Sequence, residues 1–237
     1  MTVSNYHIVM PVKDAIDVAE EAIRAVLRTG EPLTVWNDRS TPENTERLCR
    51  LQQQLGFSLI HASDLTDNPS PNYRLLLITE QQKALADKAH LLIVESDVMV
   101  GNDTFARLQQ AATEGVGMVA AVTVDRRGNI NYPYEYARKT AAEGQNALHT
   151  TKHLSFCCTL LTHALLEACP FNQLDAGKDW FDVTVSHKSL QAGLQNLLLL
   201  DTPVLHLPHS SRPWKQLKYT HPLRYYSHKL IHRSDRI

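Results

Sequence analysis

Short apolar runs alternate with segments of helical periodicity through residues 1–125, and this alternation limits the fold more than any other feature of the chain. Between residues 15 and 28, apolar residues recur mostly at steps of three and four, which predicts an amphipathic helix. Further helices are expected from Pro42, over residues 73–88 and over 103–112. The apolar runs predict strands at residues 6–12, 33–36, 57–61, 91–94 and 117–122. Strands that alternate with helices favour an α/β fold with a mostly parallel sheet flanked by helices.

Two polar clusters directly follow predicted strands. Residues 37–40 (Asn-Asp-Arg-Ser) come after the second strand, and residues 95–97 (Glu-Ser-Asp) come after the fourth. Ligands of parallel α/β sheets bind beyond the carboxyl ends of the strands, so both clusters are expected to open into one crevice. Between them, Ser40 or Thr41 is expected to cap the helix that Pro42 starts.

The pattern changes after residue 125. Residues 125–146 are polar and are expected to form an extended loop or an edge hairpin. No linker divides residues 1–211, so we expect one domain with a larger half, about 1–125, and a smaller half, about 126–211. In the smaller half the sequence predicts a strand at 155–161, helices at 162–169 and 182–192, and strand-like pieces at 197–200 and 204–207.

Bulk properties exclude several classes of protein. A net charge of −1 leaves no electrostatic footprint for nucleic acid, and no apolar run reaches the roughly 18 residues that a membrane helix needs. Residues 1–6 are polar and lead directly into a strand, so no signal peptide is expected. The four cysteines show no CxxC spacing, and adjacent Cys157 and Cys158 lie in an apolar stretch, which favours buried free thiols over a metal or disulfide role. These features predict a globular protein of a reducing, cytoplasmic compartment.

Glu95 and Asp97 are the first candidates for chemistry. Two carboxylates that lie two residues apart at the end of a buried strand can both reach a ligand on the loop side. Their hard oxygen atoms suit Mg²⁺ or Mn²⁺, which bind diphosphates through few protein groups. The alternative is a solvated loop whose acids cap the helix that starts near Asn102 or Asp103.

Asp182 and His206 are the candidates of the smaller half. A carboxylate at a helix N-terminus is expected to stay ionised, so Asp182 can act as a general base; the alternative is a helix-capping acid, and Asp179 competes for the role. His206 and His209 follow the last predicted strand, where an imidazole can complete a metal site or pair with phosphate. The alternative for both histidines is a polar side chain that is simply hydrogen-bonded.

Five short motifs follow one another over about residues 6–211: Ile8-Val-Met-Pro-Val-Lys-Asp14, Trp36-Asn-Asp-Arg-Ser-Thr41, Leu92-Ile-Val-Glu-Ser-Asp-Val98, Phe181-Asp182 with Gly193 eleven residues later, and Val204-Leu-His206. In this order and spacing they resemble the family-two inverting glycosyltransferases. The third motif is similar to the family's DXD strand, the fourth to its ED pair and later Ala-Gly turn. The resemblance implies a GT-A fold, which is Rossmann-like, with the larger half for the nucleotide-sugar and the smaller half for the acceptor.

The resemblance also implies a role for each matching position. Asp97 would ligate the Mn²⁺ or Mg²⁺ ion that bridges the donor diphosphate, His206 would complete that site, and Asp182 would be the catalytic base. Asp38 would contact the base, usually uracil, and Glu95 would lie near the ribose or the metal. The full set of positions expected at the donor nucleotide-sugar is Pro11, Val12, Asp38, Arg39, Glu95 and Ser96.

Several positions depart from the family pattern. Glu95 replaces the usual first Asp of the DXD motif, and Asn37 replaces the first acid of the base-binding pair. Phe181 replaces the Glu beside the catalytic base, which removes one carboxylate from the acceptor side. Arg39 stands where Gly is common and is expected either to change the loop or to reach the diphosphate. The family's Arg-Asn element is not visible within residues 73–86.

The implied activity is metal-dependent inverting transfer of a sugar from a nucleoside-diphosphate sugar, with a UDP-sugar favoured, to a hydroxyl of a glycan or lipid-linked acceptor in surface glycan or polysaccharide synthesis. One alternative is a non-catalytic scaffold with the same fold, which the loss of a Glu at Phe181 favours. A second alternative is a sugar nucleotidyltransferase. That class needs a Gly-rich phosphate loop, and residues 11–14 contain no glycine.

Residues 212–237 form a basic tail in which Lys and Arg alternate with Tyr, Leu and Ile. Such a segment can bind the anionic inner face of a membrane beside a lipid-linked acceptor. The alternative is a terminal helix that packs on the domain or on a second copy of the chain in a homo-oligomer.

Overall fold

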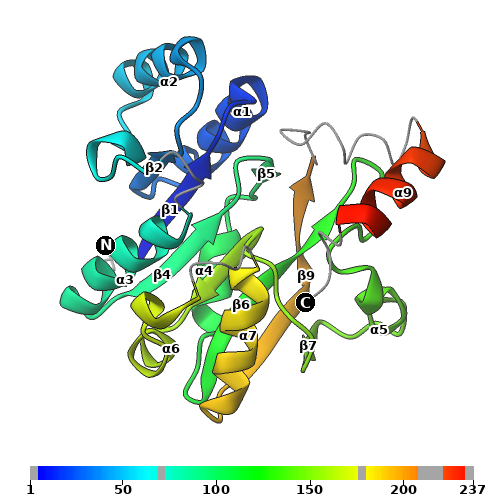
Figure 1. Ribbon diagram of the computed structural model, residues 1–237. Helices are drawn as coiled ribbons and strands as arrows, with labels where there is room; N and C mark the ends of the chain where they lie inside the picture. Colours follow the sequence, from blue (N-terminus) through cyan, green and yellow to red (C-terminus); the bar gives the residue numbers. More distant parts are fainter. Residues whose placement is uncertain (1–4, 69–72, 176–179, 208–220, 233–237) are drawn as a thin grey trace. The chain divides into compact units, whose positions relative to one another are not determined.

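The computed structural model describes residues 5–68, 73–175, 180–207 and 221–232 (Figure 1). The chain divides into two compact units, Met1–Leu207 and Pro208–Ile237, and each is described by itself.

One sheet runs through the first unit in the order β3-β2-β1-β4-β8-β6-β9-β5, and β7 pairs with β9. Strands β3, β2, β1 and β4 are mutually parallel, and β6 and β9 are parallel to each other. Only β8, β5 and β7 run antiparallel to their neighbours among the described strands. The mostly parallel α/β sheet is therefore confirmed. The strands are β1 Tyr6–Val12, β2 Leu33–Asn37, β3 Ser58–His61, β4 His90–Val94, β5 Val98–Met99, β6 Val116–Val124, β7 Ala147–His149, β8 Cys158–Leu161 and β9 Gln195–His206.

Helices cover both faces of this sheet (Figure 1). One buried apolar cluster joins the sheet to α1, α2 and α4, and a second joins it to α3, α6 and α7. Each of these six helices buries apolar side chains against the sheet, which is the main source of its stability. The helices are α1 Ile16–Leu27, α2 Pro42–Leu55, α3 Tyr73–Ala86, α4 Thr104–Ala111, α5 Arg138–Ala142, α6 His163–Ala168 and α7 Phe181–Gln191, with short 3₁₀-helices at Ala62–Asp64, Glu135–Ala137 and Phe171–Gln173.

Local sequence signals set the ends of two of these helices as predicted. The Thr41 side chain accepts a hydrogen bond from the Asn44 backbone N–H at 3.4 Å, and Pro42 is the first residue of α2. Gly193 follows α7 with a φ of 77°, a left-handed conformation that glycine adopts without a Cβ clash. The polar cluster 37–40 begins at Asn37, the last residue of β2, and the cluster 95–97 directly follows β4.

Residues 125–146 differ from the predicted loop or hairpin. Val124 and Ile130 form an isolated antiparallel bridge, after which the chain turns into a 3₁₀-helix and α5. Tyr134 anchors this segment to the domain and is fully buried. Its hydroxyl donates to the Ser155 carbonyl at 3.1 Å and accepts from the Ser155 N–H at 3.0 Å. Because α5 spans five residues, it is too short to show an apolar period.

The two strand-like pieces predicted at 197–200 and 204–207 form one strand, β9. Asp201, Thr202 and Pro203 interrupt the apolar run, but they do not end the strand. The pairing with β6 shifts between Ala121 and Val122, so that Ala121 lies opposite Leu199 and Val122 opposite Pro203. This bulge absorbs the extra residues of β9 and keeps His206 at its end.

The second unit contains helix α9, Pro222–His232, within the predicted basic tail. Apart from His221, the other residues of the tail lie outside the described residues, and so does His209. Among the helices of the described chain, none combines the length and the apolar character that a bilayer crossing requires.

Candidate functional site

A tight turn brings the carboxylates after β4 next to the end of β9. The Val98 N–H donates to the Glu95 carbonyl at 3.1 Å, and β5 then pairs antiparallel with β9 so that Val98 lies opposite His206. The Leu207 N–H donates to the Asp97 carbonyl at 2.9 Å. The backbone therefore fixes Asp97 and His206 side by side, as the predicted metal site requires. Ser96 is buried within the turn.

His206 has one ring nitrogen committed to the protein and one that faces Asp97. Its Nδ1 lies 2.9 Å from the Tyr132 carbonyl oxygen, and its Nε2 lies 3.5 Å from Asp97 Oδ2. A carbonyl oxygen only accepts, so Nδ1 carries a proton and donates it. An attractive contact between Nε2 and the Asp97 carboxylate then requires either a second proton, on Nε2, or a metal ion between the two groups. This arrangement suits a metal-binding histidine.

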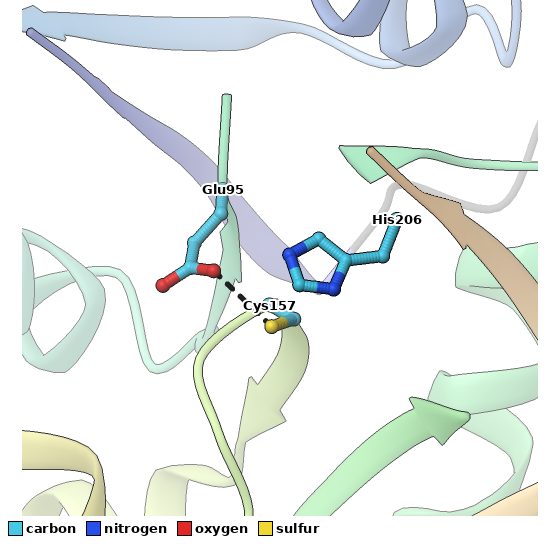
Figure 2. Close-up of side chains that lie close together, drawn as sticks. All are labelled: Glu95, Cys157 and His206. Atoms are coloured by element: carbon cyan, nitrogen blue, oxygen red, sulfur yellow. Dashed lines mark hydrogen bonds between the residues drawn. The ribbon is translucent and has the colours of Figure 1, made fainter. Parts of the chain in front are cut away.

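Cys157 completes a cluster with Glu95 and His206 (Figure 2). The Cys157 thiol donates to Glu95 Oε2 at 3.1 Å, and one possible ligand atom from each of the three residues lies within 4.8 Å of the others. We refer to Glu95, Asp97, Cys157 and His206 as the carboxylate cluster. The cysteine is a free, buried thiol, as predicted, but its place beside Glu95 was not predicted.

Burial and like charge perturb the carboxylate cluster. Burial, followed by the charge of Asp97, raises the pKa of Glu95 to about 7, against the smaller opposing effects of Cys157 and His206. Burial alone lowers the pKa of His206, but the hydrogen bond and charge of Asp97 outweigh it and raise that pKa above its usual value. Burial and the charge of Glu95 raise the pKa of the Cys157 thiol. Each of these shifts favours the protonated form of its group, so the cluster disfavours the ionisation of both carboxylates together, and a bound cation would relieve this.

Asp182 lies in the first turn of α7 and is half-buried. Its Oδ1 accepts a hydrogen bond from the Val183 N–H at 2.9 Å. Burial raises the pKa of Asp182 in spite of that hydrogen bond, so the effect is opposite to the one expected from the helix N-terminus alone. The charge of Asp182 also contributes to the raised pKa of Glu95. Asp182 and the carboxylate cluster therefore lie within electrostatic reach of each other. Asp179, the competing acid, lies outside the described residues.

An aromatic stack lies beside Asp182 and Glu95. The Tyr73 ring is nearly parallel to Phe156 and Phe181, with centroid separations of 6.2 and 6.3 Å. Burial, then the charges of Glu95 and Asp182, raise the pKa of Tyr73 well above its usual value, and its buried hydroxyl has no hydrogen-bond partner among the described residues. Phe181, which stands where the family has Glu, is therefore part of this apolar wall.

The loop after β2 is built differently. Asn37 is buried; its side-chain oxygen accepts from the Ser40 N–H, and its amide lies 3.0 Å from both Thr45 Oγ1 and His61 Nδ1. These bonds hold the loop in shape, which gives Asn37 a structural role in place of the family's acid. The Arg39 guanidinium donates to the Thr66 carbonyl, so in this structure it connects this loop to the segment after β3.

The other residues predicted to contact the nucleotide-sugar lie along β1 and at the same edge of the sheet. Pro11 pairs with Trp36 and Val12 with Asn37, and the Asp38 N–H donates to the Val12 carbonyl at 2.8 Å. Strand β1 lies between β2 and β4. Because the three strands are parallel, Asp38 and Glu95 follow strand ends at one edge of the sheet, as the sequence predicted.

The donor set fits a divalent cation. Two carboxylates and one imidazole are ligands of Mn²⁺ and Mg²⁺ sites, and Nε2 of His206 is oriented by its partner nitrogen's hydrogen bond. The sulfur of Cys157 beside them would be a ligand atom of a different kind.

No family model and no curated protein matches the sequence. Among solved structures, the fold is similar to TarS from S. aureus, with 15% identity and a TM-score of 0.55 over 85% of this chain and 60% of that one. It is also similar to GalNAc-T7 with UDP, GalNAc and Mn²⁺, with 12% identity and a TM-score of 0.60 over 89% of this chain and 45% of that one.

A third similar structure is glucosyl-3-phosphoglycerate synthase from Mycobacterium tuberculosis in complex with phosphoglyceric acid, with 14% identity and a TM-score of 0.53 over 90% of this chain and 75% of that one. The chain thus spans less than two thirds of TarS and of GalNAc-T7. At these identities the likeness establishes the fold alone. The chain has the GT-A fold that its motifs predicted.

Proposed function

We propose that this protein is a metal-dependent, inverting glycosyltransferase that uses a nucleoside-diphosphate sugar. The observation that carries the proposal is the approach of Asp97 and His206, 3.5 Å apart, beside Glu95 at the edge of a GT-A sheet where ligands bind. Asp97 and His206 are far apart in the sequence and come together only in the fold. Asp182 lies within electrostatic reach of this group, so a metal site and a candidate base share one region.

In the proposed reaction, Asp182 accepts the proton of an acceptor hydroxyl. The hydroxyl oxygen forms a bond to the anomeric carbon while the bond from that carbon to the diphosphate oxygen breaks, and the configuration inverts. A raised pKa improves Asp182 as a base as long as it is ionised at the working pH. The cation held by Asp97, His206 and Glu95 would neutralise charge on the departing diphosphate.

The donor is proposed to be a UDP-sugar. The TarS and GalNAc-T7 structures with UDP support this choice, and the manganese ion in the latter supports a metal cofactor. Pro11, Val12 and Asp38 would line the nucleotide site, with Glu95 and Ser96 toward the ribose and diphosphate. We propose a glycan or lipid-linked acceptor and a cytoplasmic site of action, with Mn²⁺ or Mg²⁺ as the cofactor.

One observation favours a second candidate, a non-catalytic binding protein with the same fold. Phe181 replaces an acid and is buried against Tyr73, so the acceptor side has lost a carboxylate. Such a protein would bind a nucleotide-sugar without consuming it.

A two-step assay separates the candidates. Thermal unfolding is measured with a panel of UDP- and GDP-sugars, with and without Mn²⁺, and UDP or GDP release is then followed for the donors that stabilise the protein. The enzyme should show metal-dependent stabilisation and metal-dependent release. Stabilisation without any release, across a panel of acceptors, would leave the binding protein as the better description.

A further inference from the structure

A sulfur atom lies among the candidate metal ligands. Cys157 Sγ is 3.1 Å from Glu95 Oε2, and both lie within 4.8 Å of a His206 ring nitrogen. Figure 2 shows the side chains directed toward one another from three places, the turn after β4, the loop before β8 and the end of β9. Cys157 and His206 are buried, so the thiol lies deep in the site.

Carboxylate oxygens, an imidazole nitrogen and a sulfur together differ from the ligand atoms of a site made for Mg²⁺ or Mn²⁺ alone. Those ions prefer hard oxygen ligands, whereas thiolate sulfur together with imidazole nitrogen is typical of zinc sites. Around tetrahedral zinc, ligand atoms lie roughly 3.3–3.8 Å apart, given bond lengths of about 2.0–2.3 Å. The pairs Asp97–His206, at 3.5 Å, and Glu95–Cys157, at 3.1 Å, are already near this spacing. Asp97 lies outside the group of Glu95, Cys157 and His206 whose ligand atoms are all within 4.8 Å of one another, so its side chain has to move closer to serve as the fourth ligand.

We propose that the carboxylate cluster binds Zn²⁺ through the Cys157 sulfur, the His206 Nε2 atom and the carboxylates of Glu95 and Asp97. On binding, a metal–sulfur bond replaces the S–H bond of Cys157, and the proton leaves to solvent. Nothing is oxidised or reduced. The Nδ1–H bond from His206 to the Tyr132 carbonyl keeps the Nε2 lone pair directed toward the ion.

The inference deepens the proposed function, because it concerns the same metal site. Four protein ligands close the coordination shell of zinc and leave no position for a diphosphate. Zn²⁺ therefore holds the site in a form that cannot take the donor, and it acts as an inhibitor that competes with Mn²⁺. Direct metal binding, measured with no sugar donor present, tests the inference independently of any transfer activity.

A second sulfur–nitrogen pair provides the control. Cys49 Sγ lies 3.9 Å from His61 Nε2 in the half-buried region between α2 and β3. Neither Cys49 nor His61 belongs to the cluster of three or more possible ligands found among the described residues. Cys49→Ser thus removes a thiol beside a histidine without touching the proposed site.

The experiment titrates the metal-free protein with Co²⁺, which reports a sulfur ligand through an intense near-ultraviolet charge-transfer absorption. We expect this absorption in the wild type and in Cys49→Ser, and its loss in Cys157→Ser and Cys157→Ala. Zn²⁺ should abolish it by displacement. Circular dichroism and thermal unfolding of both Cys157 variants, without metal, verify that each is folded.

Affinity ratios give the second measurement. Most nitrogen and oxygen sites already prefer Zn²⁺ to Mn²⁺, so a preference for zinc alone does not test the inference. The ratio of Zn²⁺ to Mn²⁺ affinity should fall by at least about tenfold in the folded Cys157 variants and stay constant in Cys49→Ser. A cobalt–sulfur absorption that survives in both Cys157 variants, or an unchanged affinity ratio, overturns the inference. Metal-dependent UDP release without a cobalt–sulfur absorption overturns it too, but leaves the proposed function in place.

Discussion

Two regions at the same edge of the sheet use their polar groups in opposite ways. In the loop pair, defined here as residues 12–15 and 37–41, polar groups bind one another: the Asp14 N–H donates to Ser40 Oγ at 2.9 Å, and Asp14 Oδ1 accepts from the Thr41 N–H at 2.8 Å. In the carboxylate cluster, Glu95 and Asp97 are two acids whose charges disfavour each other.

The difference distinguishes a structural region, the loop pair, from the candidate binding site, the carboxylate cluster. Hydrogen bonds hold the loop pair in a shape that includes left-handed backbone at Asp14, Ala15 and Arg39, with φ of 54°, 50° and 56°. In the carboxylate cluster, by contrast, burial and the charge of Asp97 raise the pKa of Glu95, and Asp97 raises the pKa of His206. The folded chain therefore keeps two acids close together although their charges repel. Substitutions should therefore reduce stability in the loop pair, and reduce function while sparing or raising stability at the site.

The largest expected effect comes from Asp182→Asn. An amide cannot accept the proton of the acceptor hydroxyl, so transfer should fall by about 10²- to 10⁴-fold, while the affinity for the donor and Mn²⁺ changes little. Initial rates of sugar transfer and donor binding by calorimetry measure the two quantities. Asp103→Asn, which changes an exposed acid at the start of α4, is the matched control. Transfer within a few-fold of the wild type in Asp182→Asn would remove Asp182 from the catalytic role.

The second effect is on stability, in the loop pair. Asn37→Ala removes a buried side chain that bonds Ser40, Thr45 and His61, so the Ser40 N–H and His61 Nδ1 lose the partner that Asn37 provides. The free energy of unfolding should fall by about 2–4 kcal/mol. Denaturant unfolding measures it, with exposed Asn102→Ala as the control. If Asn37→Ala unfolds like the wild type, the loop pair does not have the structural role that its hydrogen bonds suggest.

The third effect has the opposite sign. Glu95→Gln should stabilise the metal-free protein by up to about 3 kcal/mol at pH 8. The carboxyl pKa is about 7 in the folded protein and ordinarily 4.5, so ionisation of Glu95 costs stability above pH 7 and costs nothing below pH 4.5. The gain of the Gln variant should therefore grow as the pH rises from about 4.5 through about 7.

Thermal unfolding in a chelator, from pH 4 to pH 8, measures this gain, and exposed Glu114→Gln is the control. The same variant should bind metal more weakly, since a carboxylate ligand has become an amide. A Gln variant that is less stable than the wild type at pH 8 would contradict the account of the carboxylate cluster as a site of unrelieved charge.

Sequence reasoning predicted the fold well because its signals are local. The apolar run of β1, the period of α1, and Thr41 with Pro42 at the start of α2 each fix an element from its own residues. Helix α5 was missed because five residues carry no period. The continuity of β9 was missed because a bulge against β6 lets Asp201 and Pro203 remain within a strand.

At the site, the order of the motifs predicted that Asp97 and His206 would lie together, and the structure places them 3.5 Å apart. Cys157 was missed. It reaches Glu95 because β8 inserts antiparallel between β4 and β6, which puts Cys158 opposite Val94. Such a pairing joins residues about 60 positions apart, and no local pattern specifies it. The signal that was present, two adjacent cysteines before an apolar run, fits a buried thiol equally well.

The smallest expected effect is at Asp14 in the loop pair, where the stability effect of a substitution should depend on pH in the opposite direction from that at Glu95. Burial alone raises the pKa of Asp14, but the hydrogen bonds from Thr41 and Asn44 outweigh it and lower that pKa. A carboxyl group with a lowered pKa contributes stability above its unfolded value of about 3.9, and this contribution disappears as the pH falls through the folded value. Asp14→Asn should thus be slightly less stable than the wild type at neutral pH, by less than about 1 kcal/mol because the group is partly exposed to solvent. The difference should shrink below pH 4, whereas the difference for Glu95→Gln grows above pH 4.5.

Thermal unfolding from pH 2 to pH 7, with exposed Asp67→Asn as the control, measures the trend. An Asp14→Asn deficit that stays constant down to pH 2 would mean that the side-chain shape of Asp14, and not its charge, holds the loop pair together.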